Sequence, residues 1–107
     1  MVDESIVDAA RGYLGALVER GLPVSFGVIF GSFATGRAHE WSDIDLVVVS
    51  PRFDESMRFQ DVAFLWRTAA DTDCRIEPVA CGRKQWAEDD SRILIEVARR
   101  EGQRVDL

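Results

Sequence analysis

The chain has 107 residues, of which 47% are hydrophobic, a size and composition that suit one folded core. Its formal net charge is -6 at pH 7, from 19 acidic against 13 basic residues. This acidic balance disfavours the broad basic surface that tracks a phosphate backbone, so direct nucleic-acid binding is not expected. The length and the hydrophobic content predict a single domain over residues 1–107.

The N-terminal segment and the cysteines indicate a soluble, cytoplasmic protein with no membrane contact. Residues 1–13 begin acidic and alternate polar with apolar side chains, unlike a secretory signal. No apolar run approaches the ~20 residues that a membrane helix needs. Cys74 and Cys81 lack a metal-ligand spacing, and we expect both to be reduced residues of the core.

Hydrophobic periodicity predicts helices that alternate with strands. The last helix is expected to bury Ile93, Leu94, Val97 and Ala98, with Ser91 as N-cap and Gly102 as stop. The expected helices cover residues 3–20, 57–70 and 91–100, the strands 24–30, 43–50 and 75–81, and short helical turns lie within 31–42 and 84–90.

This order of elements predicts an α/β (α+β) domain, a small mixed sheet of about three strands with helices packed on it. Pro78 interrupts the third strand, because proline has no N–H for a sheet ladder. The third strand is therefore expected at a sheet edge or a bulge.

Two acidic residues open the second strand, in Asp43-Ile44-Asp45. Side chains two apart on a strand point to the same face, so the carboxylates of Asp43 and Asp45 are expected side by side. Like charges at this separation repel unless a divalent cation lies between them, and carboxylates suit Mg²⁺. Alternatively, Asp43 caps a turn and Asp45 is a solvated residue of an edge strand.

Gly31 and Ser32 lie directly after the first strand and before a helical turn, and ten residues separate Ser32 from Asp43. Backbone N–H groups at such a turn are free to bind an anion, and glycine permits close approach. The Ser32 hydroxyl can donate to a phosphate oxygen, and Gly36 with Arg37 could extend the cradle. The competing interpretation is an ordinary serine cap after a glycine that ends the strand.

Three other phosphate or metal motifs fit this segment poorly. Arg37-Ala38 stands where a P-loop needs Lys-Ser/Thr, which removes the phosphate lysine and the magnesium hydroxyl. In haloacid-dehalogenase phosphatases and many nucleotide-sugar glycosyltransferases the D-x-D follows an apolar strand, whereas here the apolar residues 46–49 come after the aspartates.

The pattern GS, ten residues, then DID resembles the signature of the DNA polymerase β-like nucleotidyltransferases. The stretch FGSFATGRAHEWSDIDLVVVS, residues 30–50, looks like the small prokaryotic members called minimal nucleotidyltransferases. The resemblance implies the polymerase β-like fold, with Gly31 and Ser32 at the phosphates of an NTP and Asp43 and Asp45 at two Mg²⁺ ions.

In this family a third acid lies on a later strand. Glu77 in RIEPVAC is the corresponding residue by this resemblance, although the family more often has aspartate there. Asp71 and Asp73 are close enough in sequence to compete for this role. His39 and Trp41 lie in the loop before the aspartates; His39 is expected to be a solvated loop residue, and Trp41 could lie near the site.

The resemblance implies in-line transfer of a nucleoside monophosphate, AMP from ATP in the first instance, to an acceptor hydroxyl. Members of this family act as antitoxins that add AMP to a tyrosine of a small helical HEPN-domain ribonuclease toxin. The chain has little beyond the expected catalytic core, so the acceptor surface must come from such a partner or from a second copy in a homo-oligomer. A non-catalytic binding module that neutralises its partner by contact, and a small-molecule nucleotidyltransferase, remain alternatives.

Overall fold

The computed structural model describes residues 2–39, 42–88 and 92–107. Asp3 caps the first helix, because its carboxylate accepts a 2.8 Å hydrogen bond from the N–H of Ser5. In chain order the elements are α1 (Glu4–Glu19), β1 (Phe26–Phe30), α2 (Ser32–Thr35), β2 (Ile44–Val49), the 3₁₀ turn η1 (Pro51–Phe53), α3 (Phe59–Thr72), β3 (Ile76–Cys81), α4 (Arg83–Glu88), α5 (Ile93–Glu101) and β4 (Gln103–Val105).

The sheet is mixed and has the strand order β3-β2-β1-β4. Strand β1 runs antiparallel to both β2 and β4, and β2 runs parallel to β3. The expected fold class is confirmed, and Pro78 lies on the edge strand β3, as expected. The sheet has four strands where about three were expected, because the polar segment of β4 becomes a strand by pairing with β1.

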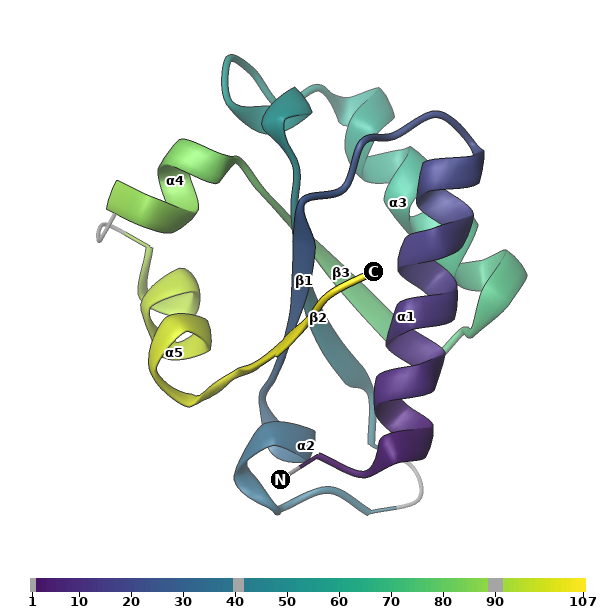
Figure 1. The fold of residues 1–107 in the computed structure, drawn as a ribbon, viewed down its shortest axis with the longest axis vertical. Helices are drawn as coiled ribbons and strands as arrows, with labels where there is room; N and C mark the ends of the chain where they lie inside the picture. The colour runs from purple at the N-terminus through teal and green to yellow at the C-terminus, as the bar shows by residue number, and fades with distance from the viewer. Residues whose placement is uncertain (1, 40–41, 89–91) are drawn as a thin grey trace.

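Helices cover both faces of the sheet. Figure 1 shows α1 and α3 on one face and α4 and α5 on the other. Strand residues Ile29, Leu46 and Val48 face the first pair, whereas Val28, Val47 and Val49 pack with Ile95 and Ala98 of α5. A strand buried on both faces needs an unbroken apolar run, which explains why residues 46–49 are all aliphatic.

Helix α1 is joined to α3 by a polar contact inside the core. The hydroxyl of Tyr13, a fully buried side chain, donates a 2.9 Å hydrogen bond to the carbonyl oxygen of Leu65. Burial raises the pKa of Tyr13, so this side chain remains a neutral donor. The contact fixes how the two helices cross above the sheet.

Three expectations about burial are wrong in detail. The side chain of Ile93 is 81% exposed and that of Leu94 is also exposed, because α5 turns Ile95 toward the sheet, together with Ala98, which is buried as expected. Cys81 is buried, but Cys74 is exposed in the connection before β3. Gly102 does end α5, whereas Ser91, the expected cap, and Trp41, in the loop before the aspartates, lie outside the described residues.

No helix in the described ranges is long and apolar enough to cross a membrane.

Candidate functional site

Three acidic residues meet at one edge of the sheet. Asp43 directly precedes β2, Asp45 is its second residue, and Glu77 is the second residue of β3. Because β2 and β3 run parallel, the two strands begin at the same edge, and the Cα atoms of Asp45 and Glu77 are register partners. Asp43 is exposed, whereas Asp45 and Glu77 are partly buried.

These carboxyl groups interact directly. Burial raises the pKa of Asp45, and the charge of Asp43 raises it further, while a hydrogen bond with Glu77 acts in the opposite direction. The pKa of Glu77 is also raised, first by burial and then by Asp43 and Asp45. Burial and neighbouring negative charge thus act in the same direction on both carboxyl groups.

The two other acids in this part of the sequence have different partners. The Asp73 carboxylate lies 2.6 Å from Nη2 of Arg75, and this hydrogen-bonded guanidinium lowers the pKa of Asp73. The Asp71 carboxylate lies 3.0 Å from Nη1 of Arg20 at the end of α1. Of the three acids considered for the later strand, Glu77 is the one in contact with Asp43 and Asp45.

The donor set fits magnesium by its chemistry, since it offers carboxylate oxygens from two adjacent strands on one face. Among residues 2–39, 42–88 and 92–107, no three His, Cys, Asp or Glu side chains stand in a finished metal-binding arrangement. A cation at this edge would therefore require the three carboxylates to approach one another more closely.

Gly31 lies against this acidic cluster. It follows the last residue of β1, Phe30, whose register partner on β2 is Asp45. The backbone of Gly31 has φ 75° and ψ −146°, a combination that is almost confined to glycine. A Cβ atom there would overlap the Asp45 carboxylate. Both the backbone conformation and the missing side chain are therefore required at this position.

Ser32 opens the short helix α2 directly after Gly31. The N–H groups of Ala34 and Thr35 donate to the Gly31 carbonyl oxygen, and the N–H of Arg37 donates to that of Ser32. Gly36 ends the helix in the left-handed conformation, with φ 75°. Ser32 is partly buried, whereas Gly36 and Arg37 are exposed. The first-turn N–H groups of Ser32 and Phe33 are not needed to close this helical turn.

A hollow of about 360 Å³ lies beside α2, between the N-terminus of α1 and the start of β3. Sequence analysis singled out His39 alone among its residues. The other residues come from segments far apart in the chain, so no local pattern could have joined them. The hollow is lined by Asp3, Ser5, Ile6, Phe33, Ala38, His39 and Arg75.

A family model matches most of the chain. The family model described as "Nucleotidyltransferase domain" matches residues 11–105, which include all the residues of the acidic edge and of the Gly31–Arg37 segment. No curated protein sequence matches the chain.

Two solved structures share the fold. One is a toxin–antitoxin structure with AMP-PNP, with a TM-score of 0.62 and 19% identity, covering 89% of this chain and 70% of that one. The other, from Sulfolobus solfataricus, is assigned as a nucleotidyltransferase; its TM-score is 0.61 and its identity 17%, covering 83% of this chain and 78% of that one. At these identities the likeness concerns the fold.

Proposed function

The chain belongs to the nucleotidyltransferase domain family, and on that premise we propose that it transfers a nucleoside monophosphate from an NTP to a hydroxyl of a partner protein, with release of pyrophosphate and of the hydroxyl proton. The observation that carries the proposal is the meeting of Asp43, Asp45 and Glu77 beside the glycine turn at Gly31. Residues 1–107 would act as one nucleotidyltransferase domain in the cytoplasm.

The glycine turn would hold the phosphates of the NTP. Gly31 lets the start of α2 lie directly against the Asp45 carboxylate, and the Ser32 hydroxyl and first-turn N–H groups can donate to phosphate oxygens. Gly36 allows the chain to turn, and the exposed guanidinium of Arg37 can approach the outer phosphates. These groups would align the NTP for attack on its α-phosphorus.

Asp43, Asp45 and Glu77 would hold two Mg²⁺ ions, which when bound neutralise charge on the attacking and leaving oxygens. The three side chains suit this role because they come from two strands that start at one edge. Their mutual repulsion disfavours the cluster until positive charge is added. The backbone of the sheet holds Asp45 and Glu77 opposite one another, on adjacent strands.

The acceptor is proposed to be a toxin. The toxin–antitoxin neighbour with AMP-PNP supports an adenine nucleotide as donor and an antitoxin role. The resemblance noted in the sequence adds the class of partner, a small helical HEPN-domain ribonuclease, with AMP added to a hydroxyl of its surface.

The test uses the protein together with its co-purified partner. Both would be incubated with Mg²⁺ and each α-labelled NTP, and the partner's growth inhibition would be measured in cells with and without this protein. We expect label on the partner from ATP and restored growth, both lost in an Asp43→Asn, Asp45→Asn variant that still binds the partner. Restored growth by this double variant, without label transfer, would instead support neutralisation by contact alone.

A further inference from the structure

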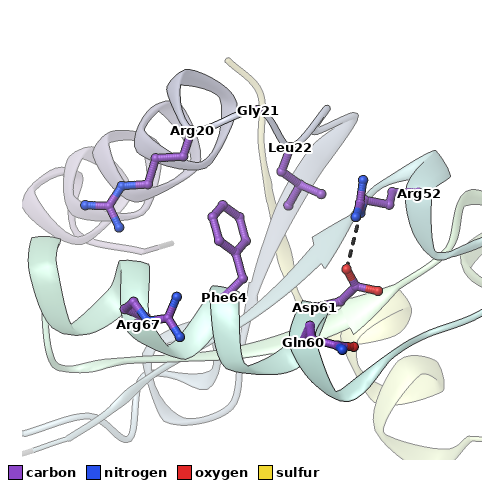
Figure 2. A pocket seen from close by; sticks show the side chains of 8 residues that line it. All are labelled: Arg20, Gly21, Leu22, Arg52, Gln60, Asp61, Phe64 and Arg67. Carbon is purple, nitrogen blue, oxygen red and sulfur yellow. Dashed lines mark hydrogen bonds and ion pairs between the residues drawn. The ribbon is translucent and has the colours of Figure 1, made fainter.

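A second pocket lies at the opposite end of β1 and β2 from the acidic edge. Residues before β1 and after β2 line it together with residues 60–67 of α3. The length of the strands therefore separates the pocket from Asp45 and Glu77. Its volume is about 360 Å³, within the range of small-ligand sites. The lining residues, all labelled in Figure 2, are Arg20, Gly21, Leu22, Arg52, Gln60, Asp61, Phe64 and Arg67.

The pocket is locally basic in a chain of net charge -6, with three guanidinium groups and one carboxylate in its lining. Nε of Arg52 lies 3.2 Å from Asp61, and Nη1 of Arg20 lies 3.0 Å from Asp71. Nη1 of Arg20 also donates a 3.2 Å hydrogen bond to the Thr68 hydroxyl. A guanidinium group has five N–H donors, so these contacts leave others on both arginines for a ligand.

Arg67 is the cation that these contacts do not balance. In the described parts of the chain, no acidic side chain lies within ion-pair distance of it. It lies one helical turn after Phe64 and Ala63 on α3 and is exposed. An unbalanced guanidinium at the rim of a pocket is suited to an anion, above all to the oxygens of a phosphate.

An apolar wall completes the pocket. Phe64 is half-buried and packs on the core beneath, and Figure 2 shows its ring standing between Arg20 and Leu22. A ring anchored in this way offers a firm surface for a flat or apolar group. The lining therefore combines hydrogen-bond donors for an anion with an aromatic ring in the same pocket.

We propose that this pocket binds a small phosphate ester, with its phosphate at Arg67 and Arg20 and its flat body against Phe64. The site is separate from the proposed transfer site and does not depend on it. The concave shape and the volume favour a small molecule over an acidic side chain of another protein.

Nuclear magnetic resonance titration of the whole protein can test this site residue by residue. The probes are AMP, uncharged adenosine and inorganic phosphate, each added without Mg²⁺. We expect AMP to shift the amide signals of residues 20–22 and 60–67, adenosine to shift them weakly, and inorganic phosphate to act mainly on the arginine side chains. Shifts from AMP confined to residues 31–37 and 43–45 would overturn the proposal.

Matched variants identify the groups responsible. Arg67→Gln removes an exposed cation and should weaken AMP binding about tenfold at residues 60–67, since hydrogen bonds to charged groups are the stronger ones. Arg83→Gln, an equally exposed arginine on α4, should leave it unchanged. Equal effects of the two variants, or shifts caused by a glutamate-rich peptide and not by AMP, would contradict the proposal.

Discussion

Asp45 and Glu77 are register partners on the parallel strands β2 and β3, and each carboxyl group lies close enough to the other to influence its pKa. One strand alone would supply the pair Asp43 and Asp45, but the parallel neighbour adds a third acid from a position more than thirty residues later. The glycine turn at Gly31 lies against the Asp45 carboxylate. Strand pairing thus assembles the candidate site.

Gly31→Ala should disable the site. The substituted residue would keep a glycine-only backbone conformation at a cost of about 1–3 kcal/mol, and its Cβ would displace the Asp45 carboxylate. We expect a lower free energy of unfolding in urea and loss of nucleotide transfer.

Gly21→Ala is the matched control, because Gly21 also has a positive φ, of 101°, but open space around its Cα. It should cost about 1–2 kcal/mol of stability through backbone strain and keep measurable transfer. Equal loss of transfer in both variants would show that the clash with Asp45 is not the cause.

Magnesium should stabilise the folded protein through the acidic edge. A ligand that binds only the folded state raises its stability, and here it also relieves repulsion among Asp43, Asp45 and Glu77. Thermal unfolding with and without millimolar Mg²⁺ should show a rise in Tm for the unaltered protein and almost none for Asp43→Asn, Asp45→Asn. Without Mg²⁺ that variant should melt higher than the unaltered protein, and a lower Tm would argue against the repulsion.

Tyr13→Phe tests the contact between α1 and α3. The substitution removes the hydroxyl that donates to the Leu65 carbonyl and leaves the buried ring in place. We expect a loss of about 1 kcal/mol in the free energy of unfolding, measured by denaturant titration, with transfer activity retained. A loss of activity without a loss of stability would mean that this contact acts on the site.

Asp61→Asn should change how stability depends on pH. The N–H of Arg58 donates to the buried Asp61 carboxylate, and this bond, with the ion pair to Arg52, lowers its pKa below the ordinary 3.8. A lowered folded-state pKa stabilises the protein above the unfolded value, and that stabilisation is lost as pH falls through the folded value.

The difference in unfolding free energy between the unaltered protein and Asp61→Asn should therefore be about 1 kcal/mol at pH 6 and should shrink below pH 4. Asp8→Asn, at an exposed position of α1, should show no such trend. A difference that stays constant down to pH 2 would contradict the role given to the Asp61 charge.

Local patterns were enough to predict most of the fold. The periodicity of α1, the aliphatic run of β2 and the proline of β3 each contain their own structural cause. Strand β4 could not be predicted, because Gln103–Val105 is short and polar and pairs only where β1 offers an open edge. The exposed Ile93 escaped prediction since its hydrophobicity favours burial and only the packing of α5 decides its direction.

The candidate site was partly predictable for the same reason. Strand geometry alone predicts that Asp43 and Asp45 share a face, and the position of Gly31 directly after a strand predicts a turn there. Glu77 entered through the family resemblance, because nothing local distinguishes it from Asp71 or Asp73; the strand register does. The pocket around Phe64 gave no local signal, since α1, η1 and α3 meet there only in the folded chain.

Nucleotidyl transfer by Asp43, Asp45 and Glu77 is tested most directly with two samples of ATP. One is labelled at the α-phosphate and the other at the γ-phosphate, and the label is followed in each. With Mg²⁺ and the partner protein present, label from the α-phosphate should appear on the partner protein, and label from the γ-phosphate should not. Glu77→Gln should lose this transfer by about a hundredfold or more, whereas Asp73→Asn should retain it. Transfer of the γ-label, or full transfer by Glu77→Gln, would contradict the account.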